Sequence, residues 1–379
     1  MTQRDFIVWS TGKWASFHRR LPVLQLCKSL PSGDRVLVVD RPWDPSRVFK
    51  KQWCWPELFT TDQGLDIFTP RLPLHDHLSY RHNGLSRLNL QVLRTQMRPW
   101  LRENTQLCHW IMHPVFYPFL SVAPPDFLLY DCYDEYTETP GQPASRLIRQ
   151  YEDILLRRAD YTMVASDIVY QRKKDRARYL ERVPNPTDLS LFYPARETGL
   201  DVPADMATLP GPRAVYIGGL KVDLDQALLL QLAAAFPKVS WVFIGRSEGA
   251  DISRLSASPN IHFLGYRPIA QIPAYLKAAH FGLIPYLLND YTSMIQPNKA
   301  VEYLAAGLGV LSSAIPGLQE LFSEEICFYR NASEAVEQVK KLLAAPRLNL
   351  PKAQLVPYDW EHYLHRIQLQ IDEKLGTRA

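Results

Sequence analysis

A lysine and a glutamate three residues apart stand at the start of an expected helix in the second half of the chain. Lys299 and Glu302 lie in the segment QPNKAVEYLAAG, in which Pro297 suits a first helical turn and Gly307 suits a C-terminal stop. Side chains at this spacing share one face of a helix. Free N–H groups at a helix N-terminus, together with a lysine, form a site for a diphosphate. A carboxylate one turn further on can accept hydrogen bonds from two ribose hydroxyls, so the pattern predicts a nucleoside diphosphate site.

A solvent-exposed Lys–Glu pair is the alternative interpretation, and such a pair contributes only about 0–1 kcal/mol to stability. The small residues that end the segment, Ala305, Ala306 and Gly307, precede a buried strand and indicate a helix packed closely against a sheet. Close packing against a sheet favours the ligand site over the surface pair.

Other residue patterns that could do chemistry are weaker. His109 and His113 are four residues apart, but their segment is strand-like and no nearby glutamate completes a zinc motif. Asp131 and Asp134 could hold a metal-bound diphosphate. The better interpretation is that they are acids at the end of a strand, close to the acceptor of a transferred group. The chain has no G-x-G-x-x-G after its first strand and no G-x-x-x-x-G-K-[ST], which argues against dinucleotide oxidoreductases and P-loop enzymes. The nine tryptophans are typical of a core, so nucleic-acid binding has little support.

Strand-like and helix-like segments alternate through nearly the whole chain, which is the pattern of an α/β protein with parallel sheets. We expect strands at 6–10, 35–40, 107–112, 126–131, 161–166, 213–219, 239–245, 260–265, 281–286 and 309–313. We expect helices at 17–30, 84–102, 147–155, 223–236, 269–278, 297–306, 332–344 and 360–375.

A proline-rich segment, VPNPTDLSLFYPA at 183–195, lacks any period and separates two runs of alternating elements. At 379 residues the chain is too long for one ordinary core. We therefore expect a Rossmann-like domain at 1–183, a linker at 184–195, a second Rossmann-like domain at 196–357 and a returning segment at 358–379. Two such domains would face each other across a cleft, where ligands usually bind.

The composition limits the class of protein and its location in the cell. Apolar residues make up 46% and charged residues 22%, which excludes a disordered chain. The net charge of +4 hides an excess of +6 in residues 1–183, which carry 26 Lys/Arg and 20 Asp/Glu. The basic segment Gln171–Arg182, with helical spacing, is either a solvated helix face or a patch that meets anionic lipid or an acidic acceptor. The five cysteines are scattered and form no C-x-x-C motif, which is typical of reduced thiols. We recognise no signal peptide and no apolar run of about 20 residues. These features indicate a cytoplasmic protein that is peripheral on the membrane at most.

The order of motifs resembles that of GT-B glycosyltransferases of the large retaining group 1 clan, in particular its bacterial polysaccharide enzymes. P-x-K-x-x-E-Y-L-A-A-G followed by a strand is similar to their donor-binding signature, and VPNPTDLSLFYPA stands where they carry a VPNGVD-x-x-x-F linker. GKWASFHRRLPVLQLCKSL, WIMHP, YDCYDEYTETPG, YIGG, NIHFLGY and FGLIPY follow in the same order. The tail YDWEHYLHRIQL resembles their last helix, which crosses back onto the first domain.

The resemblance implies roles for individual positions. It assigns the ribose hydroxyls to Glu302, and sites of donor binding to Gly12, Lys13, Gly218, Gly219, Lys221, Arg246, Gly265, Tyr266, Pro297 and Lys299. His113 and Asp134, with Lys299, would be the residues that carry catalysis, and no metal is required. Two departures stand out: the clan's second glutamate, eight residues before the first, is Met294, and the linker glycine is Pro186.

The resemblance therefore implies transfer of a sugar from a nucleoside diphosphate sugar to a hydroxyl of a glycan or lipid-linked acceptor, with retention. A GT-B epimerase or phosphorylase, or a non-catalytic partner, are the alternatives. Asn289, Asp290 or Ser293 could replace the missing glutamate.

Overall fold

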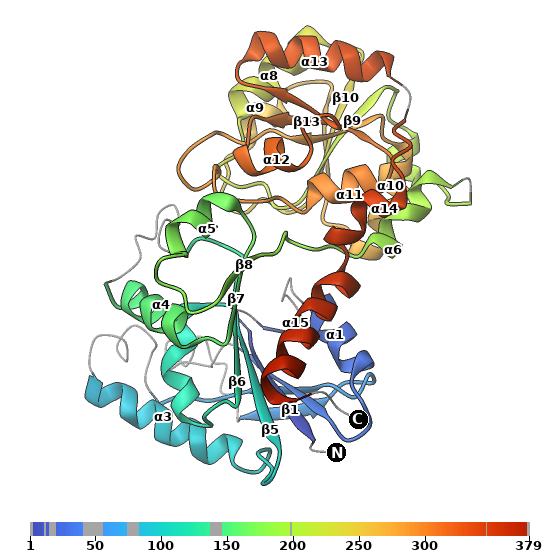
Figure 1. The fold of residues 1–379 in the computed structure, drawn as a ribbon. Coiled ribbons are helices and arrows are strands. Elements are labelled where there is room, and N and C mark those ends of the chain that lie inside the picture. The colour runs from blue at the N-terminus through green and yellow to red at the C-terminus, as the bar shows by residue number, and fades with distance from the viewer. Residues whose placement is uncertain are drawn as a thin grey trace. The chain divides into compact units, whose positions relative to one another are not determined.

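The computed structural model describes residues 3–10, 13–14, 20–40, 56–73, 83–136, 146–197, 199–345 and 347–376. Contacts divide the chain into two compact units, Met1–Val183 with Tyr363–Ala379, and Pro184–His362. Each unit is built around one sheet covered by helices on both faces, as Figure 1 shows with its labelled elements.

The first unit has an eight-stranded sheet in the order β3-β4-β2-β1-β5-β6-β7-β8. All neighbouring strands are parallel except β3 and β4, which form an antiparallel hairpin at one edge. The strands are β1 (Arg4–Trp9), β2 (Arg35–Val39), β3 (Glu57–Thr60), β4 (Asp66–Thr69), β5 (Gln106–Ile111), β6 (Phe127–Cys132), β7 (Tyr161–Val164) and β8 (Leu180–Arg182). The central strands are apolar along their length because helices bury both of their faces.

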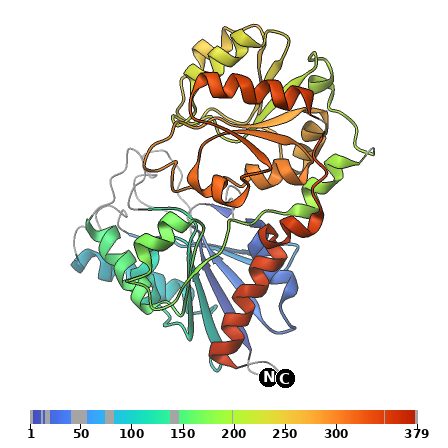
Figure 2. The same cartoon turned by 45° about the horizontal axis from the view of Figure 1, so that its top comes forward.

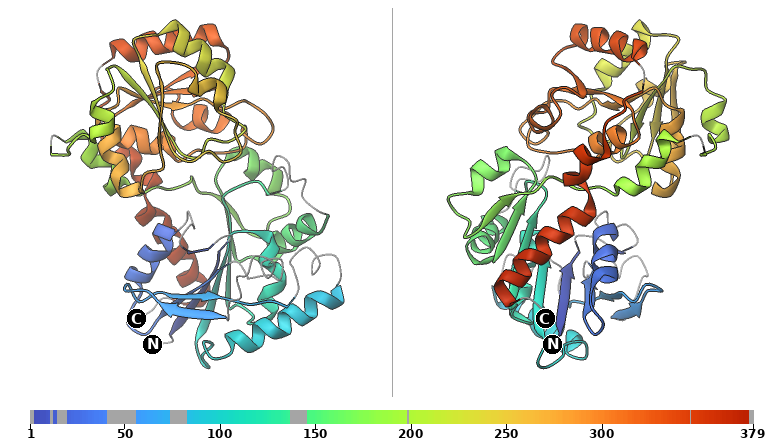
Figure 3. Two further views of the ribbon diagram at one scale, coloured as in Figure 1. Left: turned by 180° about the vertical axis from the view of Figure 1, so that it is seen from behind. Right: turned by 45° about the vertical axis from the view of Figure 1, so that its right-hand side comes forward.

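The helices of the first unit lie on both faces of this sheet, and the direction in which the chain moves from strand to strand decides the face. Helices α1 (Arg20–Ser29) and α15 (Trp360–Leu375) cover one face. Helices α3 (Asn83–Met97), η3 (Pro114–Ser121), α4 (Arg146–Arg158) and α5 (Asp167–Lys173) cover the other (Figures 1 and 3). Right-handed crossovers require this division, because the chain moves one way from β1 to β2 and the opposite way from β5 to β8.

The expected C-terminal helix, α15, is confirmed over Trp360–Leu375, and from Tyr363 onward it belongs to the first unit (Figure 2). The Arg4 guanidinium of β1 pairs with Asp372 at 2.5 Å and donates to the Gly376 carbonyl at 2.7 Å. The ring of Tyr363 lies 6.5 Å from that of Trp110 on β5. Because Arg4 is buried, this ion pair ties the end of the chain firmly to its first strand.

The second unit has a six-stranded, wholly parallel sheet in the order β11-β10-β9-β12-β13-β14. Its strands are β9 (Arg213–Ile217), β10 (Ser240–Ile244), β11 (Ile261–Gly265), β12 (Phe281–Ile284), β13 (Gly309–Ser313) and β14 (Ile326–Tyr329). One face carries α8 (Gln226–Ala235), α9 (Ser253–Ser256) and α13 (Ala332–Ala344), and the other carries α10 (Ile272–Ala278) and α11 (Lys299–Ala305). The remaining helices are α6 (Leu189–Phe192), η4 (Tyr193–Arg196), α7 (Ala204–Ala207), η5 (Ile269–Gln271), α12 (Pro316–Leu321), α14 (Lys352–Leu355) and η6 (Val356–Tyr358).

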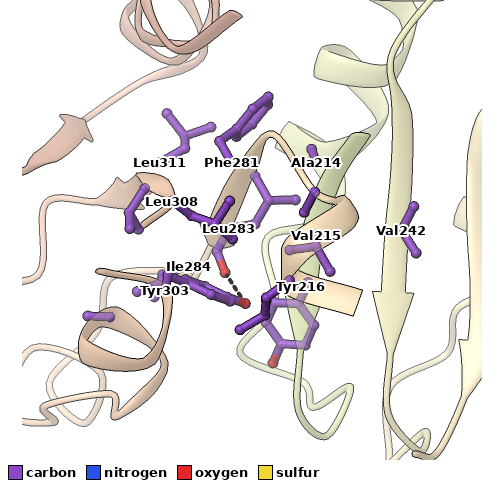
Figure 4. Close-up of a cluster of buried hydrophobic side chains, with 14 of the residues drawn as sticks. Ala214, Val215, Tyr216, Val242, Phe281, Leu283, Ile284, Tyr303, Leu308 and Leu311 are labelled. Carbon is purple, nitrogen blue, oxygen red and sulfur yellow. Dashed lines mark hydrogen bonds between the residues drawn. The ribbon is translucent and has the colours of Figure 1, made fainter. Parts of the chain in front are cut away.

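Tyr303 locks α11 onto the sheet of the second unit. Its ring packs so closely on β12 that a Cβ at Gly282 would collide with it. Its hydroxyl accepts from the Ile217 amide at 3.0 Å and donates to the Leu283 carbonyl at 3.5 Å, the latter dashed in Figure 4. The buried side chains of this cluster come from β9, β10, β12 and β13, and from Leu308 just before β13 (Figure 4). The helix that begins with Lys299 is thus fixed by a ring and two hydrogen bonds.

The structure differs from the sequence expectations in several places. The linker region is not irregular throughout, because α6 and η4 form within it. The hairpin β3–β4 was not expected. The basic segment Gln171–Arg182 is not one helix: α5 ends at Lys173, and β8 begins at Leu180. Lys173 is buried between the carboxylates of Glu152 (2.7 Å) and Glu135 (3.2 Å), so it belongs to no surface patch.

Across the described ranges, none of the helices combines the length and the apolar character that a membrane crossing needs.

Candidate functional site

The loops that follow β11, β10, β9 and β12 leave the same edge of the second sheet, because these neighbouring strands are parallel. From β9 the chain proceeds to β10 on one side, and from β12 it proceeds to β13 on the other. The carboxyl ends of β9 and β12 therefore flank a switch point, where open α/β sheets bind ligands. Gly218 follows β9 directly, and Tyr286 follows β12 by two residues.

Glycines allow the loop after β9 to lie close against the loop after β10. Gly218 has φ +129°, a conformation that favours glycine, and its amide donates to the Ile244 carbonyl at 2.9 Å. A Cβ at Gly245 would collide with the Gly218 carbonyl oxygen. The Tyr216 hydroxyl donates to the Gly219 carbonyl at 2.9 Å and fixes the next residue. The turn thus carries no side chain of its own at Gly218 or Gly219, although the exposed carboxylate of Glu248 lies against Gly219.

Lys299 is the first residue of α11, and its side chain points toward this glycine turn. Its Nζ would lie 3.4 Å from a Cβ placed on Gly218. The ammonium donates a hydrogen bond to the Tyr286 hydroxyl and lies 4.7 Å and 4.9 Å from the ring centroids of Tyr216 and Tyr286. The cation therefore stands beside the bare backbone at the switch point, where an anionic ligand would be stabilised.

Glu302 is half-buried one helical turn after Lys299. Burial raises the pKa of its carboxyl from 4.5 to about 6, although Lys299 and a hydrogen bond from Thr187 both oppose the rise. The Thr187 hydroxyl donates to Glu302 Oε1 at 3.4 Å. The carboxylate can accept two hydroxyl groups of a ribose, and it is ionised at neutral pH.

Donor binding should therefore weaken as the pH falls through about 6, because a protonated carboxyl is a poorer acceptor. We expect the KM for a nucleoside diphosphate sugar to rise by about tenfold per pH unit below that pKa. Thr187→Val removes the hydrogen bond that lowers the pKa, so the inflection should move to a higher pH, whereas Thr187→Ser should keep it. A sugar nucleotide is the correct probe, since the terminal phosphate of a free nucleotide titrates near pH 6 itself. A pH-independent KM would contradict the role of the carboxylate.

Other expected donor residues lie at the same edge of the sheet, where Lys221, Arg246 and Tyr266 are exposed. The Arg246 guanidinium lies 4.4 Å from the centroid of the Tyr266 ring. The backbone carbonyl of Arg246 accepts a hydrogen bond from the Leu220 amide at 2.8 Å. Gly265 has φ +72° at the end of β11. Lys221 is exposed in the turn after β9. The structure thus brings Lys299 to the glycine turn and Arg246 to Tyr266.

Two arginines that the sequence analysis missed hold the far end of α11. Arg196, in η4, donates to the carbonyls of Leu304 (2.7 Å) and Ala305 (2.6 Å). Arg347 donates to the Ala306 carbonyl at 2.8 Å. These carbonyls lie at the C-terminal end of α11, where positive charge interacts favourably with the helix dipole. No local signal could have identified them, because each is distant from α11 in sequence.

The start of α11 differs from the expectation. The helix runs over Lys299–Ala305, so Pro297 precedes it by two residues instead of occupying its first turn. The preceding residues bind the linker: Asn298 donates to the Pro186 carbonyl at 3.0 Å, and Gln296 accepts from the Asn185 amide at 3.0 Å. The lysine is therefore placed by the linker as well as by the helix. Gly307 ends the helix with φ +76°, as expected.

Met294 stands where the second glutamate of the resembling clan would be, and its side chain is buried in the second unit. Asn289, a possible replacement, accepts from the Thr292 amide at 2.8 Å and so stabilises its own turn. Asp290 is exposed, and Ser293 is half-buried.

The expected residues of the first unit come from two neighbouring strands. His113 follows β5, and Asp134 follows β6, by two residues each, so both lie at the same edge of that sheet. The Nδ1 atom of His113 accepts from the Val115 amide at 3.0 Å, and its ring lies 4.3 Å from that of Tyr136. Asp134 Oδ1 accepts from the Glu135 amide at 2.9 Å.

Other polar residues of the first unit have structural partners. Asp131 is buried and accepts from the Trp110 indole at 3.1 Å. His109 accepts from the Trp9 indole at 3.1 Å, and burial lowers its pKa to about 3, in keeping with a hydrogen-bonded role in the core. Lys13 is exposed, and Gly12 lies outside the described residues. Of the residues that the structure describes, no three His, Cys, Asp or Glu side chains converge as metal ligands.

Comparison with known proteins identifies the family of the second unit. Residues 211–345 match the sequence model of the glycosyl transferases, group 1. TuaH of Bacillus subtilis strain 168, whose name describes a glycosyltransferase of teichuronic acid biosynthesis, is 25% identical over 337 residues, which are 83% of this chain and 82% of TuaH.

Solved structures share the fold over nearly the full length. Sucrose-phosphate synthase from Thermosynechococcus elongatus has a TM-score of 0.71 at 16% identity, over 99% of this chain and 100% of the synthase. HepE from Anabaena, in complex with UDP and glucose, has a TM-score of 0.66 at 14% identity, over 97% of this chain and 99% of HepE. At these identities the likeness shows the fold.

Two parallel α/β sheets, with a C-terminal helix that returns to the first, define the GT-B class of glycosyltransferases. The chain has this GT-B fold, its residues 211–345 match the group 1 glycosyl transferases, and it is similar to TuaH at 25% identity.

Proposed function

We propose that the protein transfers a sugar from a nucleoside diphosphate sugar to a hydroxyl of a glycan or lipid-linked acceptor in bacterial cell-surface polysaccharide synthesis. The observation that carries this proposal is Lys299, placed beside the glycine turn at the switch point of the second sheet, with Glu302 one helical turn further along α11. The name of TuaH supports the polysaccharide, and the UDP and glucose bound by HepE support a UDP-sugar as donor.

The proposed reaction retains the configuration at the sugar and needs no metal ion. Negative charge develops on the leaving diphosphate, and Lys299, Lys221 and Arg246 supply positive charge at one edge of the second sheet. His113 and Asp134 orient the sugar and the acceptor hydroxyl. Neither residue is required to act as the general base of an inverting enzyme.

A panel of UDP, GDP, ADP and TDP, with their sugars, tests the donor. We expect one nucleotide, UDP before the others, to raise the unfolding temperature, and its sugar to be transferred to an acceptor extract with retention. An altered or released sugar without acceptor would instead identify an epimerase or a hydrolase. The buried Met294 favours one rival, a non-catalytic partner, which would show neither the thermal shift nor turnover.

We also propose that the protein works at the cytoplasmic surface of the membrane, with one face of the first unit on anionic lipid. Helices α3, α4 and α5 cover that face (Figure 3). Exposed basic residues lie on these helices or directly after them: Arg87, Arg94, Arg98, Arg146, Arg149, Arg157, Arg158, Arg172 and Lys174. Two further arginines of this region are already paired, Arg176 with Asp153 and Arg178 with Asp160.

Replacing Arg149 and Arg157 on α4 with glutamine should weaken binding to phosphatidylglycerol vesicles by about 30-fold, since each basic residue contributes about 1 kcal/mol near such a surface. Co-sedimentation at low salt measures the effect, and high salt should abolish binding in all variants. Lys238→Gln with Lys340→Gln removes the same charge from exposed positions of the second unit and is the matched control. Equal binding to neutral phosphatidylcholine vesicles would overturn the proposal.

A further inference from the structure

Lys299 is enclosed by two tyrosines that come from the strands flanking the switch point. Tyr216 belongs to β9 and Tyr286 follows β12, and both side chains are buried. The lysine ammonium lies within 5 Å of both ring centroids, at 4.7 Å and 4.9 Å, and donates to the Tyr286 hydroxyl. These distances are those of a cation attracted by aromatic rings.

The enclosure holds the ammonium without neutralising it. Burial raises the pKa of the Tyr216 and Tyr286 phenols well above the ordinary value for tyrosine, so both side chains stay uncharged. A carboxylate partner would cancel the charge of the lysine, whereas a phenol occupies only one of its three N–H donors. Lys299 and Glu302, both described, form no ion pair although they are one turn apart. The lysine therefore keeps its charge for a ligand.

Tyr216 links the lysine to the glycine turn. Its ring contacts the ammonium, and its hydroxyl donates to the Gly219 carbonyl at 2.9 Å. The Tyr216 side chain thus contacts both the Lys299 ammonium and the glycine turn that this ammonium faces. Nothing local predicts this link, since Tyr216 and Lys299 are more than 80 residues apart in the sequence.

We propose that Tyr216 and Tyr286 are positioning residues that hold Lys299 ready for the leaving diphosphate. This inference rests on the proposed function. A lysine stem is flexible, and a cation that is already oriented stabilises developing charge without reorganisation. A released lysine would still reach the diphosphate of the bound donor. Loss of the enclosure should therefore lower kcat more than it raises the KM for the donor.

A double-mutant cycle with Tyr286→Phe and Lys299→Met tests whether the tyrosine acts through the lysine. Tyr286→Phe keeps the ring and removes the hydroxyl, and we expect kcat to fall by about 10-fold with less than about a 2-fold change in KM. In the Lys299→Met background the same substitution should change kcat by less than about 2-fold. Tyr329→Phe removes a buried phenol from the edge strand β14 and is the matched control, expected to leave kcat unchanged in both backgrounds.

Unfolding temperatures and the fraction of active sites, measured for every variant, separate a positioning role from loss of folded protein. Equal losses of kcat in both backgrounds would show that Tyr286 does not act through Lys299 and would overturn the inference alone. Absence of any sugar transfer by the wild type would overturn the proposed function, and the inference with it.

Discussion

Glu302→Gln should lower kcat/KM for the donor by at least about 100-fold. The amide keeps the shape of the side chain but loses the charge, and hydrogen bonds to a charged acceptor contribute about 1.5–3 kcal/mol each. Steady-state transfer, with the donor varied, measures the loss. Glu324→Gln removes an exposed carboxylate from the loop before β14 and should leave the rate unchanged.

The same substitution should raise stability, which separates a functional residue from a structural one. The pKa of Glu302 in the folded protein is about 6, above its ordinary 4.5, because burial disfavours the ionised form. Below pH 4.5 the carboxyl is protonated in both states. Between pH 4.5 and about 6 the unfolded chain ionises this carboxyl while the folded protein keeps it protonated, so stability falls by up to about 2 kcal/mol, and the loss is complete above pH 6.

Glutamine is uncharged, so the variant should be the more stable protein above pH 7, and the two should agree near pH 4. Urea unfolding at both pH values measures the difference. A variant that is inactive and also less stable at pH 7.5 would show that Glu302 supports the fold and not the donor.

Apolar runs predicted the central strands of both sheets because such strands are buried on both faces. The sequence did not predict the hairpin β3–β4, because β3 is short and exposed along its whole length. It therefore has neither a run of apolar residues nor an alternation of apolar and polar residues. The basic segment Gln171–Arg182 has helical spacing, yet it contains the end of a helix, a turn and an edge strand. Charge patterning alone could not show that Lys173 turns inward to two carboxylates on other elements.

The candidate donor site was predicted from residues that are local in sequence. The spacing of Lys299 and Glu302 places both on one helix, α11, and their binding of a nucleotide stays a prediction. The side chains that contact these two residues come from elsewhere in the sequence: Thr187 from the linker, Tyr216 from β9 and Tyr286 from the loop after β12. Spacing carries no information on such contacts, because parallel strands bring distant segments to one edge only after folding.

Lys299→Met should lower kcat by about 100- to 1,000-fold, the range found when one preorganised group that stabilises transition-state charge is removed. Methionine retains the apolar part of the lysine stem between Tyr216 and Tyr286, so the fold should be preserved. The affinity for the intact sugar nucleotide should fall less than kcat, because negative charge on the diphosphate increases as the sugar leaves.

Lys238→Met is the matched control, since Lys238 is exposed before β10, at the opposite edge of the same sheet, and carries the same charge. It should transfer sugar at the wild-type rate, which excludes net charge as the cause. If Lys299→Met instead raised the KM and left kcat unchanged, the lysine would bind donor and transition state equally. Lys221 and Arg246, the exposed cations of the same edge, would then be the groups that stabilise the departing diphosphate.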